Sequence, residues 1–213
     1  MAVRVKTKDD FPLDPDAPRL QTVLRYTATG SEHRNDMQIF PPSFSTALGG
    51  GPFAEEGIRF TRVAELAQSS GELPLNSNDP HEQMFINCRY LEHPRDRERL
   101  REGVRIILDM MEHEPFNVIV EELILPMEAH LAFDETLDRW LLENVWIGQH
   151  LSGTCKMGSD SDEMAVVDQY GRVPGVQGLR VADASIMPDC IRANTNCTTI
   201  MIGERVANWI INH

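Results

Sequence analysis

The most informative part of this chain reads GQHLSGTCKMG (Gly148 to Gly158), then VVDQYGRVPGVQGLRVADASIMP (Val166 to Pro188), and finally RANTNCTTIMIG (Arg192 to Gly203). A histidine precedes a Gly-Thr turn, glycines punctuate the middle segment, and two asparagines open an apolar helical pattern. Nothing earlier in the sequence is as dense in special residue types. We interpret this stretch as one half of a cofactor site.

Composition limits the classes to which the chain can belong. With 213 residues and 41% apolar side chains, it is long enough for one large domain or two small ones with a real core. The formal net charge of −13 argues against nucleic acid or an anionic membrane surface as a partner. The four cysteines show no C-x-x-C spacing and no histidines at zinc-finger distance, so we expect no metal site.

The sequence also carries expectations about location. No apolar run approaches the ~20 residues that a membrane span requires, so we expect no transmembrane segment. The first ten residues, MAVRVKTKDD, lack the apolar core of a secretory leader. We therefore expect a soluble, cytoplasmic chain.

Upstream of the motif region, strand patterns alternate with helix patterns. Residues 1–20 are polar with three prolines and are expected to be a flexible lead-in. Residues rich in β-branched and aromatic side chains predict strands over 22–29, 36–40, 58–66 and 118–125. Residues 84–91 fit either a strand or a short helix.

Two helices are predicted in the same part of the chain. Over 95–112, apolar residues recur at spacings of four, three and four: Leu100, Val104, Ile107 and Met111. The second helix should begin with Asp134 as its N-cap and carry Leu137, Trp140, Leu141 and Val145 on one face. The order of elements predicts an α+β fold, a mainly antiparallel sheet with helices on one face.

The motifs, taken together, resemble one enzyme family. They are His150-x-x-Gly153-Thr154-Cys155-x-Met157-Gly158, then Gly178-Leu179-Arg180-Val181-x-Asp183-Ala184-Ser185, and finally Asn194-Thr195-Asn196-x-x-Thr199-Ile200-Met201-Ile202-Gly203. This set is similar to the C-terminal signature of the glucose–methanol–choline (GMC) oxidoreductases, flavoenzymes that oxidise alcohols with FAD. Upstream, Gly71-Glu72-Leu73-x-Leu75-x-Ser77-x-Asp79-Pro80 resembles the substrate-domain segment of that family. The resemblance covers most of the chain from about residue 70 onward.

One part of the family pattern is missing. The family begins with a βαβ unit whose G-x-G-x-x-G motif holds the FAD pyrophosphate, and this sequence has no such motif. The resemblance therefore implies a GMC-like substrate-binding domain over 21–147, followed by the C-terminal segment of an FAD-binding domain over 148–213. That segment should contribute a strand, ending at Asp183, and a helix to an FAD-binding α/β layer. We expect a truncated product or a split enzyme, with a companion chain that carries the N-terminal FAD-binding part.

The resemblance also assigns roles to residues. Removal of hydride from an alcohol carbon requires the hydroxyl proton to leave, so a base must lie within hydrogen-bond reach of the oxygen. By resemblance His150 is that base, with the hydride passing to the flavin N5, and Asn194 is the second active-site residue. An amide at Asn194 can donate to a developing alkoxide without titrating. The substrate is then a small-molecule alcohol.

Further residues are implied as FAD contacts by the same resemblance. A helix that begins near Thr195 would point its unpaired N–H groups and positive dipole end at the cofactor, with Thr195 and Asn196 close by. Asp183 and Ala184 match an FAD contact made largely through backbone, and Gln149 is a neighbouring candidate. The residues alone also allow plainer interpretations: a turn histidine at 150, helix caps at the asparagines, and a strand end at Asp183.

Two alternatives to alcohol oxidation stay open. The chain could be a non-catalytic fragment or binding subunit that carries the motif residues without flavin. GMC-like folds also include lyases and a photodecarboxylase, and retention of both His150 and Asn194 favours alcohol oxidation over these.

Overall fold

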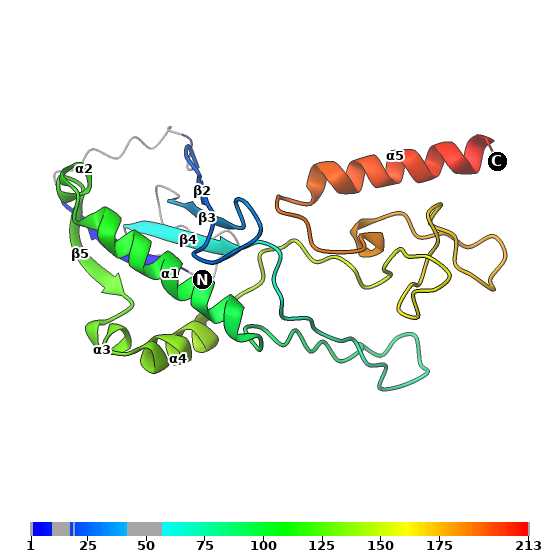
Figure 1. The fold of residues 1–213 in the computed structure, drawn as a ribbon, viewed down its shortest axis with the longest axis horizontal. Coiled ribbons are helices and arrows are strands. Elements are labelled where there is room, and N and C mark those ends of the chain that lie inside the picture. The colour runs from blue at the N-terminus through cyan, green and yellow to red at the C-terminus, as the bar shows by residue number, and fades with distance from the viewer. Residues whose placement is uncertain (1, 10–17, 19, 42–56, 213) are drawn as a thin grey trace. The chain divides into compact units, whose positions relative to one another are not determined.

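The computed structural model describes residues 2–9, 18, 20–41 and 57–212, and the chain falls into two compact units (Figure 1). Unit 1 comprises Met1–Ala64, Gln68–Ser70 and Arg89–Trp146; unit 2 comprises Glu65–Ala67, Gly71–Cys88 and Ile147–His213. This division differs from the expected domain ranges because residues 71–88 group with the C-terminal segment.

Unit 1 is built on a five-stranded sheet in the order β2-β3-β4-β1-β5. Its strands are β1 (Ala2–Thr7), β2 (Leu24–Tyr26), β3 (Met37–Phe40), β4 (Ile58–Ala64) and β5 (Val120–Leu125). Every neighbouring pair is antiparallel. The predicted α+β class with an antiparallel sheet is therefore confirmed.

The flexible lead-in predicted for residues 1–20 is wrong where the structure describes residues 2–7. They form β1, which pairs with β4 on one side and β5 on the other. Val3 and Val5 alternate with polar residues and are fully buried, which is the period-two pattern of a half-buried strand. The sequence suggested a flexible segment because its three prolines are a stronger signal than two alternating valines. Residues 10–17 and 19 lie outside the described part of the chain.

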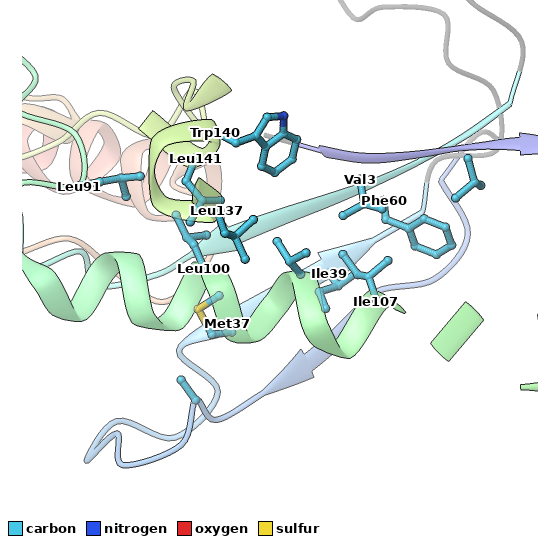
Figure 2. Packing of buried hydrophobic residues seen from close by; sticks show 13 residues of the cluster. Val3, Met37, Ile39, Phe60, Leu91, Leu100, Ile107, Leu137, Trp140 and Leu141 are labelled. Atoms are coloured by element: carbon cyan, nitrogen blue, oxygen red, sulfur yellow. The ribbon is translucent and has the colours of Figure 1, made fainter. Parts of the chain in front are cut away.

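Helices cover the face of the sheet onto which Val3 and Val5 point. They are α1 (Pro94–Met111), α2 (Glu114–Asn117), α3 (Glu128–Leu131) and α4 (Asp134–Asn144). Figure 2 shows side chains of the sheet, α1 and α4 gathered in one core. The stripe predicted for α1 is confirmed, because Leu100, Val104 and Ile107 are buried and Met111 packs against them.

Both long helices of unit 1 begin close to the predicted positions. Pro94 is the first residue of α1, and the His93 side chain caps it by accepting from the Arg95 N–H. Asp134 is not an N-cap as predicted: Phe133 precedes α4, and the Thr136 hydroxyl accepts from the Phe133 N–H at 3.2 Å. Asp134 instead stands in the first turn and pairs with arginines of α1.

Unit 2 has a small core with few regular elements. The 3-10 turn η1 (Ala184–Ile186) and the helix α5 (Asn196–Asn212) enclose its buried apolar side chains, which are Val167, Ile186, Met187, Ile202 and Val206. The predicted helix is present, but no strand forms among the described residues of this unit. Around Asp183 the chain makes an isolated bridge, Arg172 to Arg180, and then turns into η1. Residues 84–91 likewise form neither strand nor helix, with one bridge between Glu72 and Asn87.

The described helices do not meet the requirements of a membrane span. None of them combines the length and the apolar character that crossing a bilayer demands.

Candidate active site

His150 lies in a loop that is fixed by backbone hydrogen bonds to η1. The N–H groups of Gly153, Cys155 and Met157 donate to the carbonyls of Ala184 (3.4 Å), Ser185 (2.9 Å) and Ile186 (2.9 Å). The chain after His150 is therefore tied to the core of unit 2, in which Ile186 is buried. This explains how a loop histidine without regular secondary structure has a defined position.

The imidazole of His150 contacts two residues at the start of α5. Its Nε2 lies 2.8 Å from Asn194 Nδ2, and its Nδ1 lies 3.2 Å from Thr195 Oγ1. His150 is half-buried, Asn194 is exposed, and Thr195 is buried. Residues that are 44 positions apart in the sequence thus form one polar cluster.

The first turn of α5 supplies further donors beside this cluster. The Thr195 carbonyl accepts from the Thr199 N–H at 2.9 Å, which is the first bond of the helix. The N–H groups of residues 196–198 consequently have no partner within the helix, and they stand at the positive end of the helix dipole. A negatively charged or electron-rich group is stabilised at such an end.

Asp183 and Ala184 shape η1. One carboxylate oxygen of Asp183 accepts from the Ser185 N–H at 2.8 Å and from the Ser185 hydroxyl at 2.5 Å. The side chain therefore caps η1, and this carboxylate oxygen already accepts from two donors of the turn. Sequence reasoning did not identify Ser185, although a serine two residues after an aspartate is a common turn signal.

The remaining candidates flank the cluster. Gln149 is exposed and adopts φ of +61°, a left-handed conformation that costs a non-glycine residue about 1–2 kcal/mol. Such strain next to His150 is typical of functional sites. Asn196 is the first residue of α5 and is exposed, so it is not the cap that the sequence also allowed.

Thr195 has a contact that the sequence did not predict. It was expected to lie near a cofactor, whereas its hydroxyl bonds to the imidazole of His150. No spacing rule relates the two residues, because the contact depends on how the 148–157 loop folds.

Cys190 is a half-buried thiol of unit 2. Burial raises the pKa of the Cys190 thiol, so it stays protonated near neutral pH and is a poor nucleophile. Among the residues that the structure describes, no group of three or more His, Cys, Asp and Glu side chains is placed to hold a metal ion.

Comparison with known proteins gives matches over most of this chain. A family model described as GMC oxidoreductase matches residues 67–203. An "Oxygen-dependent choline dehydrogenase" from Escherichia coli is 39% identical over 162 residues, which is 76% of this chain and 29% of that protein. The chain therefore spans less than a third of the length of the curated relatives that it matches.

Solved structures give matching folds. Pyridoxine 4-oxidase from Mesorbium loti superposes with a TM-score of 0.80 at 20% identity, over all of this chain and 42% of that one. A formate oxidase from Aspergillus oryzae RIB40 superposes with a TM-score of 0.71 at 28% identity, over 83% of this chain and 31% of that one. At 20% identity the first match is a likeness of fold.

Proposed function

This chain belongs to the GMC oxidoreductase family, and we propose that it supplies the base and the oxygen ligand for FAD-dependent oxidation of an alcohol. The observation that carries the proposal is the 2.8 Å contact between His150 Nε2 and Asn194 Nδ2. The chain covers 29% of the length of a curated relative, so the reaction also requires an N-terminal FAD-binding part.

The donors of this chain fit the polar edge of a flavin. The N–H groups that open α5, together with the exposed side chains of Asn194 and Asn196, provide hydrogen-bond donors at a positive helix end. We expect Gln149 and the backbone at Asp183 and Ala184 to add contacts. When bound, FAD accepts the hydride that leaves the alcohol carbon.

The residues of this chain handle the proton and the charge on oxygen. Asn194 Nδ2 can only donate, so Nε2 of a neutral His150 accepts and carries the lone pair of a base. A substrate hydroxyl within reach of both groups would give its proton to Nε2. The amide of Asn194 would then stabilise the negative charge that develops on the oxygen.

Choline is the first alcohol to test, because relatives that share 39% identity with this chain are named choline dehydrogenases. Other small primary alcohols form the comparison set. A reaction with none of them, in the presence of bound flavin, would favour the lyase-type chemistry that the sequence left open.

The partner that we propose is the N-terminal FAD-binding part, supplied by a companion chain or a longer parent. Helix α5 buries Ile202 and Val206 in unit 2. Other apolar residues of the helix are exposed, with exposed fractions of 58% for Ile200, 60% for Ile210 and 80% for Ile211. With Ala207, these exposed residues lie on a second apolar side of the helix, where a protein surface would cover them.

An absorbance spectrum with intact mass tests the cofactor and the partner. The proposal predicts flavin bands only in preparations that contain the FAD-binding part, either as a second polypeptide or in a longer chain. Flavin bands that never appear, even when that part is supplied, would support the non-catalytic binding subunit.

The role of Asn194 is tested by replacing it with alanine. Removal of one preorganised donor from an oxyanion site lowers the chemical rate by roughly a hundredfold to a thousandfold. We expect this loss in the rate of flavin reduction at saturating alcohol. Asn208→Ala, an exposed substitution on α5, is the matched control. Equal rates in the Asn194 and Asn208 variants would contradict the assignment.

A further inference from the structure

We propose that Thr195 is a positioning residue that keeps the ring proton of His150 on Nδ1, so that Nε2 keeps its lone pair. The inference deepens the proposed function, since it concerns how His150 is made ready to act as a base. It stands on the 3.2 Å contact between Thr195 Oγ1 and His150 Nδ1 and on the burial of Thr195, which is 9% exposed.

The two contacts of the imidazole together define one proton position. A neutral imidazole has one N–H donor and one acceptor nitrogen. Asn194 donates to Nε2 at 2.8 Å, which favours a ring proton on Nδ1, and that proton needs an acceptor of its own. Nδ1 then donates to Thr195 Oγ1, and the hydroxyl oxygen serves as the acceptor.

Thr195 is itself held firmly enough to orient a ring. Its carbonyl accepts from the Thr199 N–H at 2.9 Å and from the Thr199 hydroxyl at 2.8 Å. These bonds fix the residue at the start of a 17-residue helix, and Thr195 is buried. The acceptor for Nδ1 therefore has a defined position, whereas a water molecule in the same place would be mobile.

The proton position matters because the other tautomer cannot do the proposed chemistry. An imidazole with its proton on Nε2 has no lone pair there to take a proton from an alcohol. It would also place two donors, Nε2–H and the Asn194 amide, against each other. In water the neutral side chain of histidine prefers the Nε2–H form, so the site must impose the Nδ1–H form.

The tautomer can be read directly from long-range proton–nitrogen NMR spectra of the isotope-labelled protein. We would record these at about pH 8, where an ordinary histidine is neutral. The signal of His150 is identified among the seven histidines by its loss in His150→Asn. The spectra are recorded on the flavin-loaded protein and on the chain alone, without substrate.

Three variants isolate the hydroxyl of Thr195. Thr195→Val keeps the shape and removes the acceptor, and we expect a shift of His150 toward the Nε2–H form. Thr195→Ser retains the hydroxyl and should retain the Nδ1–H form. Asn208→Ala, an exposed substitution further along α5, leaves these contacts in place and should leave the tautomer unchanged. An Nε2–H signal in the unmodified protein, or an unchanged Nδ1–H signal in Thr195→Val, would overturn the inference.

A kinetic measurement separates positioning from a merely structural role. Loss of one hydrogen bond that orients a group corresponds to roughly a tenfold rate effect. We expect Thr195→Val to lower kcat by roughly that factor with little change in KM, and Thr195→Ser to recover most of the loss. A rise in KM alone would contradict the positioning role. The tautomer is measured without turnover, so it is independent of activity. If the protein showed the Nδ1–H form but oxidised no alcohol, the proposed function would be refuted and this inference would stand.

Discussion

At the scale of single residues, the guanidinium of Arg99 lies buried between two carboxylates. Its Nη1 is 3.2 Å from Asp36 Oδ2 and its Nη2 is 2.7 Å from Asp96 Oδ1. Burial alone would raise the pKa of both aspartates. Hydrogen bonds outweigh it, chiefly from the Ala28 N–H to Asp36 and from the Ser69 hydroxyl to Asp96, so each pKa lies below its ordinary value.

Arg99→Met should destabilise the protein in a way that depends on pH. The variant leaves two buried carboxylates without their cation, which costs about 3–5 kcal/mol in the free energy of unfolding near neutral pH. Depressed folded-state pKa values stabilise the fold above the unfolded value of about 4, and this stabilisation is lost as pH falls through them. The loss in the free energy of unfolding caused by Arg99→Met should therefore be smaller at about pH 3 than at about pH 7, as measured by urea unfolding.

The control for Arg99 is an exposed ion pair of the same helix. Glu98→Gln removes the partner of Arg95, whose pairing at 3.1 Å is exposed to solvent, and it should change stability by less than about 1 kcal/mol. If Arg99→Met lowered the free energy of unfolding as little as Glu98→Gln does, the buried ion pairs would not stabilise the fold as proposed. A loss that is larger at low pH than at neutral pH would contradict the proposal as well.

Asp183 offers a second test at this scale. Its carboxylate bonds to Ser185, so we expect the cofactor to contact the backbone of the turn and not the charge. Asp183→Asn keeps an oxygen acceptor and should bind flavin as the unmodified protein does. Asp183→Ala loses the cap, at about 1 kcal/mol in stability, and should bind less flavin. Equal flavin loss in both variants, measured by absorbance, would mean that the charge itself is the contact.

At the scale of elements, two glycines of unit 2 share a left-handed backbone but differ in their surroundings. Gly171 has φ of +72°, and a Cβ there would lie 2.6 Å from the Val181 carbonyl oxygen. Gly175 has φ of +80° with nothing within 4 Å of the same point. Only the first glycine lets two segments of the chain approach closely, where the Val181 N–H donates to the Gly171 carbonyl at 2.8 Å.

Alanine at these two positions should therefore give unequal losses. Gly175→Ala should lower the free energy of unfolding by the backbone strain alone, about 1–2 kcal/mol. Gly171→Ala adds a steric overlap with a carbonyl and should cost about 2 kcal/mol more. Thermal and urea unfolding measure both values. Similar losses in the two variants would show that the turn at Gly171 can open without disturbing the core of unit 2.

The elements also show what the sequence could and could not predict. Helix α1 was predictable because one apolar stripe recurs at helical spacing over 18 residues. Strand β1 was missed because only Val3 and Val5 carry its pattern, and its stability comes from neighbours far along the chain. The strand expected at Asp183 fails for the converse reason: strand-like residues form no ladder without a paired strand, and next to Asp183 the described residues of unit 2 provide only the isolated bridge from Arg172 to Arg180.

The contacts of the candidate site were likewise only partly predictable from the sequence. Pairing of His150 with Asn194 was expected only from the family motifs, since no local rule connects residues 44 positions apart. The bond from Thr195 to the same imidazole depends on the loop conformation and on which nitrogen faces the helix. Such geometry follows from tertiary structure and not from residue type.

At the scale of the whole molecule, the exposed apolar side of α5 should join the FAD-binding part. Ile211 is 80% exposed, and a charge there would have to be buried in the complex. Ile211→Glu should weaken association at least tenfold. Asn208→Glu introduces the same charge at an exposed polar position and should have little effect. Calorimetric titration of this chain with a separately produced FAD-binding part measures both, and equal affinities would place the contact elsewhere.

Anaerobic bleaching of the flavin shows whether this chain provides the base for alcohol oxidation. The flavin-loaded protein is mixed with choline or another primary alcohol without oxygen, and the absorbance of the oxidised flavin is followed. We expect bleaching in the unmodified protein and in His130→Ala, whose imidazole stacks on Trp140 in unit 1. We expect His150→Ala to retain bound flavin, and its rate of bleaching should fall at least a hundredfold. Bleaching at the same rate in His150→Ala would contradict the assignment of the base.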